Sequence, residues 1–272
     1  MKQLLTIIAI FICSISFAAR VDTLNVYSTA MQKHIPCVFI TPSKMKNKKE
    51  LPVIYLLHGW SGNYAQWIND APQLKQIADD MKLIIVCPDG GYGSWYFDSP
   101  IDSSFRYETF ISKELIAYTD AHYNTIANKA GRAITGLSMG GHGGLFLSIR
   151  HPDIFGAGGS ICGGVDFRPF PNNWDLAKRL GDTICCQSNW DQNTVVYQLP
   201  KAQNKNLALI IDCGLDDFFL PVNRVLHQLM MQLNIPHDYT ERPGAHNTAY
   251  WSNAINYQIL FFSNFFRNSL NQ

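Results

Sequence analysis

Residues 135–144 read TGLSMGGHGG, and within this run Gly136 to Gly140 form a G-x-S-x-G pentapeptide centred on Ser138. The pattern is typical of a nucleophile elbow, a sharp turn between a strand and a helix that holds a serine hydroxyl out of the fold. Glycine has no Cβ, so glycines two residues before and after the serine let the two backbones approach closely. The run therefore predicts that Ser138 is a nucleophile.

The residues on either side of the pentapeptide fit this turn. Residues 132–135 (RAIT) have the length and composition of a short buried strand. Residues 143–150 form an apolar segment of helix length, and His151-Pro152 is expected to end that helix, because the residue before a proline avoids the helical conformation. A bare G-x-S-x-G occurs often by chance, whereas the strand before it and the helix after it favour a true elbow.

Apolar runs of strand length alternate with segments of helix length along the rest of the chain. This alternation predicts an α/β fold with a mostly parallel central sheet and helices on both faces. Strands are expected at residues 51–57, 83–87, 133–137, 157–162, 207–212 and 239–241. Helices are expected at residues 73–80, 109–123, 141–150, 221–233 and 253–268. Residues 21–27 and 36–40 are expected to form an antiparallel hairpin at one edge of the sheet.

The first 19 residues have the pattern of a secretory signal peptide. Lys2 is followed by an apolar stretch and then by small residues, so cleavage is expected after Ala18 or Ala19. The apolar run is short for a membrane-spanning helix, which needs roughly 20 residues. A secreted or periplasmic protein without an integral membrane segment is therefore expected.

The remaining residues, 20–272, are expected to form a single domain. Residues 163–203 are rich in Asn, Asp, Trp and Pro and lie between two expected core strands. An insertion at this point is expected to cover the nucleophile. Lys and Arg total 22 against 21 Asp and Glu, which gives no indication of a nucleic-acid partner.

Six cysteines lie outside the signal peptide. Cys87 and Cys213 fall at the ends of expected buried strands, where a free cysteine acts as a small apolar residue. Cys185 and Cys186 are adjacent in a loop-like stretch and are the best candidates for a disulfide bridge. No C-x-x-C pair is present, so no zinc or redox site is predicted.

A serine hydroxyl becomes a good nucleophile only when a histidine takes its proton, and that histidine needs a carboxylate to orient it. In the α/β-hydrolase arrangement the chain order is serine, acid, histidine. The strand at 207–212 runs into a turn that carries Asp216 and Asp217, and His246 lies in a Gly/Pro loop after the next short strand. Asp217 is preferred to Asp216 as the acid, because strand-end turns that present a triad acid usually read G-x-x-D, counted here from Gly214.

An early strand ends in His58-Gly59-Trp60, where this arrangement supplies one backbone donor to an oxyanion. The expected oxyanion donors are the N–H groups of Trp60 and Met139. His58 is expected to hold the loop by hydrogen bonds. Four side chains are further candidates for substrate contact: His58, Trp95, His142 and Trp251.

Five segments together resemble the putative esterase (esterase D-like) group of α/β hydrolases. They are LLHGWSGNYAQW (56–67), GLSMGGHGG (136–144), HPDIFGA (151–157), CGLDDFF (213–219) and GAHNTAYW (244–251). Within that group the chain is most similar to tributyrin esterases and to feruloyl and acetylxylan esterases of carbohydrate esterase family 1. The resemblance implies the α/β-hydrolase fold, with Ser138 as nucleophile, Asp217 as acid and His246 as base.

The resemblance also implies a serine carboxylesterase that works through an acyl-enzyme and needs no metal or cofactor. S-formylglutathione hydrolases of this group are cytoplasmic, so the export signal favours an acyl group on a plant polysaccharide, acetyl or feruloyl, as the substrate. The alternatives are a general short-chain (tributyrin-type) esterase, a thioesterase of the formylglutathione type, an acyltransferase, and a carbohydrate-binding protein on a hydrolase scaffold.

Overall fold

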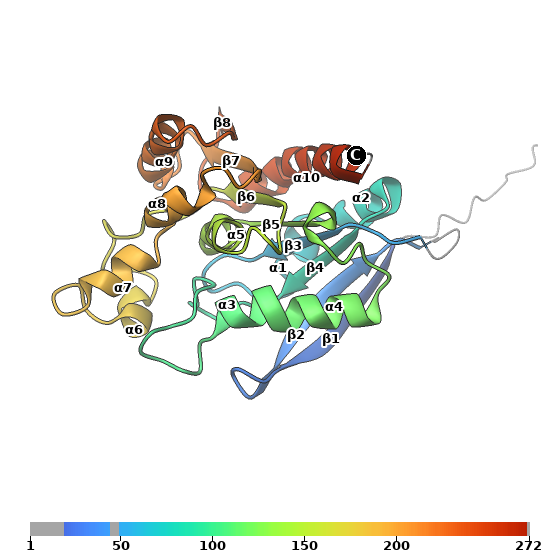
Figure 1. The fold of residues 1–272 in the computed structure, drawn as a ribbon, viewed down its shortest axis with the longest axis horizontal. Helices are drawn as coiled ribbons and strands as arrows, with labels where there is room; N and C mark the ends of the chain where they lie inside the picture. The colour runs from blue at the N-terminus through green and yellow to red at the C-terminus, as the bar shows by residue number, and fades with distance from the viewer. Residues whose placement is uncertain (1–18, 44–48, 271–272) are drawn as a thin grey trace, which may run out of the picture.

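The computed structural model describes residues 19–43 and 49–270. Residues 1–18 of the expected signal peptide lie outside this part of the chain. Within the described residues, one eight-stranded sheet has the order β1-β2-β4-β3-β5-β6-β7-β8 (Figure 1). The strands are β1 (Arg20–Ser28), β2 (Lys33–Thr41), β3 (Val53–Leu57), β4 (Ile84–Pro88), β5 (Arg132–Gly136), β6 (Ala157–Ile161), β7 (Ala208–Gly214) and β8 (Asp238–Arg242).

The sheet is mixed but mostly parallel. β1 and β2 form an antiparallel hairpin, and β2 pairs antiparallel with β4. Every other pair, from β4 through β3, β5, β6 and β7 to β8, is parallel. The α/β fold, the edge hairpin and the parallel core expected from the sequence are therefore confirmed.

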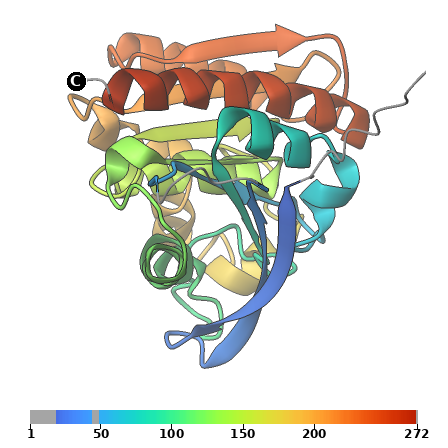
Figure 2. The same ribbon diagram turned by 90° about the vertical axis from the view of Figure 1, so that its right-hand side faces the viewer.

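Helices cover both faces of this sheet (Figures 1 and 2). One face packs against α3 (Tyr107–Thr109), α4 (Ile116–His122), α5 (Met139–Arg150) and α9 (Leu220–Gln232). The other packs against α1 (Gln66–Asp70), α2 (Leu74–Met81) and α10 (Thr248–Leu270), and Figure 2 shows α2 and α10 in front of the sheet.

The covering of both faces explains why the core strands are apolar throughout. Along β3, Tyr55 and Leu57 belong to one hydrophobic core, while Ile54 and Leu56 belong to the other. Successive side chains of a strand point to opposite faces, so a strand covered on both sides needs an apolar residue at every position.

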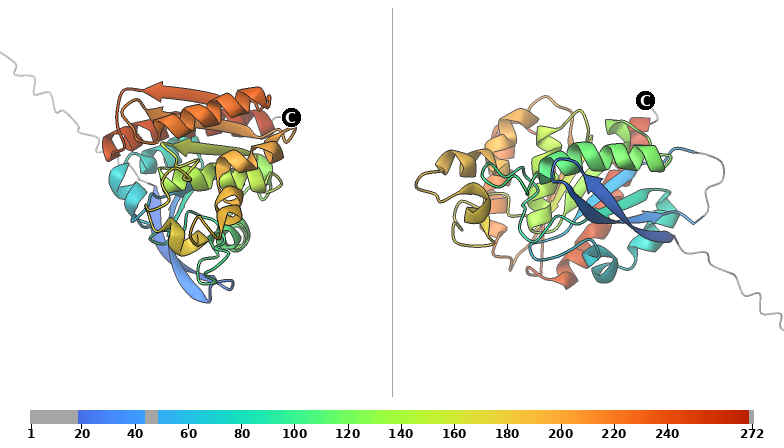
Figure 3. Two further views of the ribbon diagram at one scale, coloured as in Figure 1. Left: turned by 90° about the vertical axis from the view of Figure 1, so that its left-hand side faces the viewer. Right: turned by 90° about the horizontal axis from the view of Figure 1, so that it is seen from below.

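The segment 163–203 folds into short helices at one end of the molecule: α6 (Leu176–Leu180), α7 (Gln187–Gln192) and α8 (Val195–Gln198). Figures 1 and 3 show α6 and α7 projecting beyond the end of the sheet. The part before α6 reaches Ser138, because the N–H of Gly164 donates to the carbonyl oxygen of Ser138 at 3.3 Å. Further along this part, the rings of Phe170 and Trp174 contact Phe219.

No helix in the described ranges is long and apolar enough to cross a membrane.

Candidate active site

Ser138 stands at the tip of a tight turn between β5 and α5. Its backbone has φ 56° and ψ −116°, a strained conformation for a residue with a side chain. The turn is possible only because Gly136 and Gly140 flank it. A Cβ on either glycine would lie 2.4 Å from the carbonyl oxygen of Leu57 in the neighbouring strand. The elbow geometry expected from the pentapeptide is therefore present.

Three side chains from the carboxyl ends of neighbouring strands form a hydrogen-bonded chain. His246 Nε2 lies 3.0 Å from Ser138 Oγ, and His246 Nδ1 lies 2.7 Å from Asp217 Oδ2. The parallel strands β5, β7 and β8 all end at this edge of the sheet, which is why residues 108 positions apart in the sequence meet. The arrangement can pass a proton from the serine to the imidazole while the carboxylate holds the ring in place.

The structure distinguishes the two candidate acids. Asp217 is buried, and its second carboxylate oxygen, Oδ1, accepts the backbone N–H of Phe219 at 2.8 Å. Asp216 is exposed to solvent, and its backbone N–H donates to the carbonyl of Gly244. The turn after β7 thus brings Asp217, and not Asp216, to His246.

The electrostatics of His246 follow from its two partners. Burial is the largest single cause and acts to lower the pKa of the imidazole, but the hydrogen bonds and charge attraction from Asp217 and Cys162 together outweigh it. The net result raises the pKa of His246 to about 9. A basic imidazole next to a serine hydroxyl is suited to act as a general base.

The two expected oxyanion donors lie on either side of Ser138. Met139 is the first residue of α5, so its N–H has no partner within the helix. Among the described residues, neither this N–H nor that of Trp60 makes a hydrogen bond within the protein. The Trp60 loop is close to the elbow, because a Cβ on Gly59 would lie 3.5 Å from the Ser138 Cβ.

Three of the candidate substrate contacts lie inside the protein. His58, Trp95 and His142 are each at most 1% exposed. His58 bonds to the backbone of Gly59 and Gly90, His142 contacts two carbonyl oxygens, and Trp95 donates to the carbonyl of Trp174. Their polar groups are occupied by backbone, so we assign them a supporting role behind the site in place of substrate contact.

Aromatic rings line the exposed side of His246. Phe218 lies 4.3 Å from the imidazole between ring centroids, is 48% exposed, and stacks on Trp174 at 5.8 Å. Trp251 meets the imidazole edge-on at 5.1 Å, and its indole N–H is buried without a hydrogen-bond partner in the described part of the chain. Of the four candidates for substrate contact, only Trp251 lies against His246 in this way.

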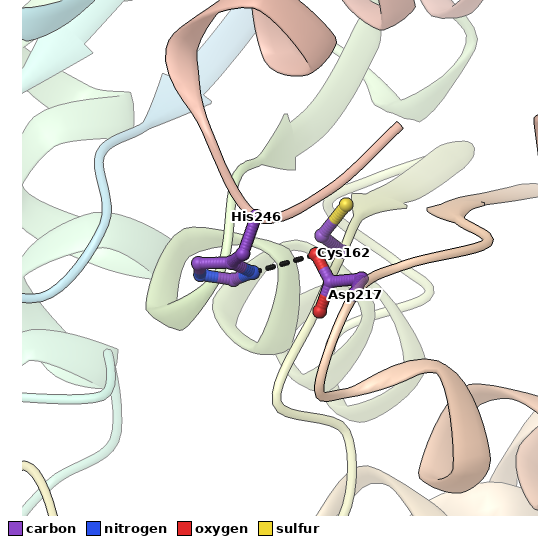
Figure 4. Close-up of side chains that lie close together, drawn as sticks. All are labelled: Cys162, Asp217 and His246. Carbon is purple, nitrogen blue, oxygen red and sulfur yellow. Dashed lines mark hydrogen bonds and ion pairs between the residues drawn. The ribbon is translucent and has the colours of Figure 1, made fainter. Parts of the chain in front are cut away.

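Sequence reasoning missed Cys162, which lies against the acid and the base (Figure 4). This residue follows β6 directly, and its Sγ lies within 4.8 Å of a carboxylate oxygen of Asp217 and a ring nitrogen of His246. The sequence carried no local signal for it, because its place follows from the strand order, in which β6 lies between the strands that carry the serine and the acid.

The other cysteines test the expected disulfide bridge and the expected burial of free cysteines. Cys87 and Cys213 are buried, as predicted for apolar cysteines. Cys185 and Cys186 are not bridged; their sulfurs lie 2.6 Å apart and Cys185 also contacts Asp182. All six cysteines in the described ranges are free, so the expectation of a bridge here is not met.

The Esterase family, described as putative esterase, matches residues 28–262 of the chain. The chain belongs to this family. Relatives that match this chain are described as esterases and serine hydrolases, and the chain has the α/β-hydrolase fold.

Individual relatives of the chain agree with the family match. The acetyl esterase of Caldicellulosiruptor saccharolyticus is 25% identical over 252 residues, which are 85% of this chain and 94% of that protein. Esterase Rv1288 of Mycobacterium tuberculosis is 28% identical over 221 residues, 72% of this chain, and the match spans about half (48%) of that longer protein. A solved ferulic acid esterase superposes with a TM-score of 0.80 at 27% identity, covering 92% of this chain and all (100%) of the other.

Proposed function

We propose that this esterase removes acetyl or feruloyl groups from plant polysaccharides through a covalent acyl-enzyme. The observation that carries the proposal is the aromatic wall of Phe218 and Trp174 beside the imidazole of His246. Planar aromatic faces next to the reacting serine suit a hydroxycinnamoyl group or a sugar ring, both of which stack on aromatic side chains. The similarity to a ferulic acid esterase and to an acetyl esterase supports the same substrate class.

In the proposed reaction His246 takes the proton of Ser138, and the serine oxygen attacks the ester carbonyl. The N–H groups of Met139 and Trp60 stabilise the oxyanion that develops. Protonated His246 then gives its proton to the alcohol that leaves. Water repeats the attack on the acyl-serine, again with His246 as base, and the acid is released.

The test is acid release from an acetylated and feruloylated arabinoxylan by the wild type, with Ser138→Ala as the control. Ferulate or acetate released only by the wild type supports the proposal and identifies the acyl group. Cleavage of a simple butyrate ester without release of either acid would instead assign a general short-chain esterase.

A second comparison tests the aromatic wall itself. Trp174→Ala should lower kcat/KM for a feruloyl ester about tenfold more than for an acetyl ester, because only the larger acyl group reaches the ring. Equal losses of kcat/KM on both esters would show that Trp174 does not contact the acyl group. A thioester substrate and an added sugar acceptor, measured in the same assay, separate thioesterase and acyltransferase activity from hydrolysis.

A fluorophosphonate that labels Ser138 separates an enzyme from a carbohydrate-binding protein on the same scaffold. The proposal expects labelling in the wild type and none in Ser138→Ala. A serine that does not react would favour the binding protein.

We also propose that the chain is exported after cleavage behind Ala18 or Ala19. The position of β1 supports this, because the strand begins at Arg20 and cleavage at either point leaves it whole. Cell fractionation with N-terminal sequencing of the processed protein tests the proposal, and full-length protein in the cytoplasm would contradict it.

A further inference from the structure

Cys162, Asp217 and His246 form a cluster of three different metal-ligating groups (Figure 4). Their ligand atoms, a thiol sulfur, a carboxylate oxygen and a ring nitrogen, all lie within 4.8 Å of one another. Each comes from the carboxyl end of a different strand in the consecutive set β6, β7 and β8. The proposed reaction uses the acid and the histidine but gives no part to the thiol.

The backbone holds Cys162 firmly in this position. Its N–H donates to the carbonyl oxygen of Asp212 at 2.7 Å, and its φ of 49° is unusual for a residue with a side chain. The preceding residue, Ile161, accepts the N–H of Ser138 at 2.9 Å. The thiol is therefore fixed relative to both the elbow and the acid turn.

The distances within the cluster fit a cation with tetrahedral coordination. Zinc binds sulfur at about 2.3 Å and nitrogen or oxygen near 2.0–2.2 Å, so its ligand atoms lie roughly 3.4–3.6 Å from one another. The pair His246 Nδ1 and Asp217 Oδ2, now at 2.7 Å, would open by less than 1 Å, roughly, to reach this spacing. Three protein ligands leave a fourth position for water.

The charges of the cluster also fit a divalent cation. A thiolate and a carboxylate carry two negative charges, and the imidazole ligand is neutral, so the loaded site has no net charge. In the described part of the chain, the ion pair of Asp217 is with His246 and involves no lysine or arginine. A buried neutral complex avoids the cost of an unpaired charge.

From this geometry we propose that Cys162, Asp217 and His246 form an inhibitory site for thiophilic divalent cations such as Zn²⁺ and Cd²⁺. The cation replaces the proton of the hydrogen bond between His246 and Asp217. The thiol proton of Cys162 leaves to water. In the protonated ring of His246 the Nδ1 proton also leaves to water while Nε2 keeps its own, and in the neutral ring the Nδ1 proton is exchanged through water for one on Nε2. Nε2 then faces Ser138 as a donor and is unable to accept the serine proton, so the ester is not attacked.

We expect the cation to reach the site from the solvent-exposed side of His246. The side chain of Asp217 is fully buried, whereas that of His246 is 16% exposed. Because soft thiolate ligands select zinc and cadmium over magnesium and calcium, the hard cations should leave activity unchanged at the same concentration.

The first experiment measures hydrolysis of a chromogenic short-chain ester at buffered free Zn²⁺ and Cd²⁺, with Mg²⁺ as the control cation. In Cys162→Ser the concentration for half-inhibition should rise at least about tenfold relative to wild type. The matched control is the double variant Cys185→Ser, Cys186→Ser, which removes the exposed thiols beside Asp182 and should leave the inhibition unchanged. Equal inhibition of Cys162→Ser and wild type would overturn the proposal, as would a wild type insensitive to millimolar Zn²⁺.

A second measurement needs neither turnover nor a Cys162 variant. X-ray absorption of the Zn²⁺-loaded double variant should show one sulfur at about 2.3 Å with nitrogen and oxygen ligands. A shell of nitrogen and oxygen alone would overturn the proposal and place the metal elsewhere, for example at the His227 and His237 pair. The same spectrum is expected from Ser138→Ala in that background, so a failure of the proposed substrate does not affect this test.

Discussion

The backbone N–H of Gly90 donates a hydrogen bond of 2.7 Å to Nε2 of His58, which joins the oxyanion loop to the end of β4. The other ring nitrogen, Nδ1, lies 2.7 Å from the carbonyl oxygen of Gly59. An imidazole that accepts at Nε2 and donates at Nδ1 must be neutral, and burial lowers the pKa of His58 in agreement. One side chain thus fixes the turn from which the Trp60 N–H is presented.

We therefore expect His58→Ala to damage the oxyanion site without touching the triad. The loss leaves the Gly90 N–H buried and unpaired, which should lower the free energy of unfolding by about 1–3 kcal/mol. It should also lower kcat/KM by roughly tenfold or more, approaching the 10²–10³ seen when an oxyanion donor is lost. Urea unfolding and steady-state kinetics measure the two effects. The control is His122→Ala, at an exposed helix end, and a His58 variant with the same kcat/KM as that control would contradict this role.

The pH dependence of activity should report the raised pKa of His246. Only the neutral imidazole accepts the serine proton, so kcat/KM should rise with pH through a midpoint near pH 9, in place of the usual 6.5, and level off above it. Asp217→Asn removes the main cause of the shift. This variant should move the rise to lower pH and lower kcat by about 10⁴.

A pH–rate profile of wild type and Asp217→Asn with an ester stable to alkali measures both changes. The matched variant is Asp216→Asn on the same turn, which should leave the profile in place because Asp216 faces solvent. A wild-type rise at pH 6.5 would show that Asp217 does not hold the imidazole as described.

Gly140→Ala should destabilise the protein, although a glycine-to-alanine change in a helix usually stabilises one. In an unhindered helix the change stabilises by about 1 kcal/mol. Here the new Cβ would lie 2.4 Å from the Leu57 carbonyl oxygen and 2.7 Å from that of His58. Backbone atoms have little freedom to retreat, so α5 must shift away from β3. We expect a lower midpoint of urea unfolding and a loss of activity; a variant more stable than wild type would disprove the close approach.

Two acidic residues at neighbouring strand ends should differ in their contribution to stability. Asp212 is fully buried and accepts hydrogen bonds from Arg242 and Tyr250. Asp212→Ala leaves that arginine without its partner and should cost about 3–5 kcal/mol of unfolding free energy. Glu241 pairs with the exposed Arg224, and Glu241→Ala should cost much less because water screens such pairs. Equal costs in urea unfolding would contradict this difference in burial.

Much of the fold follows from local sequence. The β1–β2 hairpin, the apolar strands of the parallel core and α5 were predictable because each depends on the period of apolar residues and on local breakers. The short helices α6, α7 and α8 were not predicted. They have only four to six residues each, too few to show a period, and they form because residues such as Trp190 pack against Phe167.

The residues of the candidate site also divide into those that local sequence predicts and those that depend on tertiary structure. Ser138 could be identified from its pentapeptide, because an elbow is a local structure whose glycines are required by contacts within a few residues and one neighbouring strand. Asp217 and His246 could be identified from chain order and loop position. The choice between Asp217 and Asp216 depended on a turn pattern, and the structure supplies the contact that distinguishes them.

What the sequence by itself determined is the set of elements whose information is local: the strands, the elbow at Ser138 and the order of acid and base. Tertiary structure alone decided which side chains meet at the carboxyl edge of the sheet. It buried His58, Trp95 and His142 behind the site, and it placed Cys162 against Asp217 and His246. The physical reason is that the order of strands in a parallel sheet, and not their spacing in the chain, sets which residues become neighbours. A cluster assembled from three strands therefore leaves no motif in the sequence.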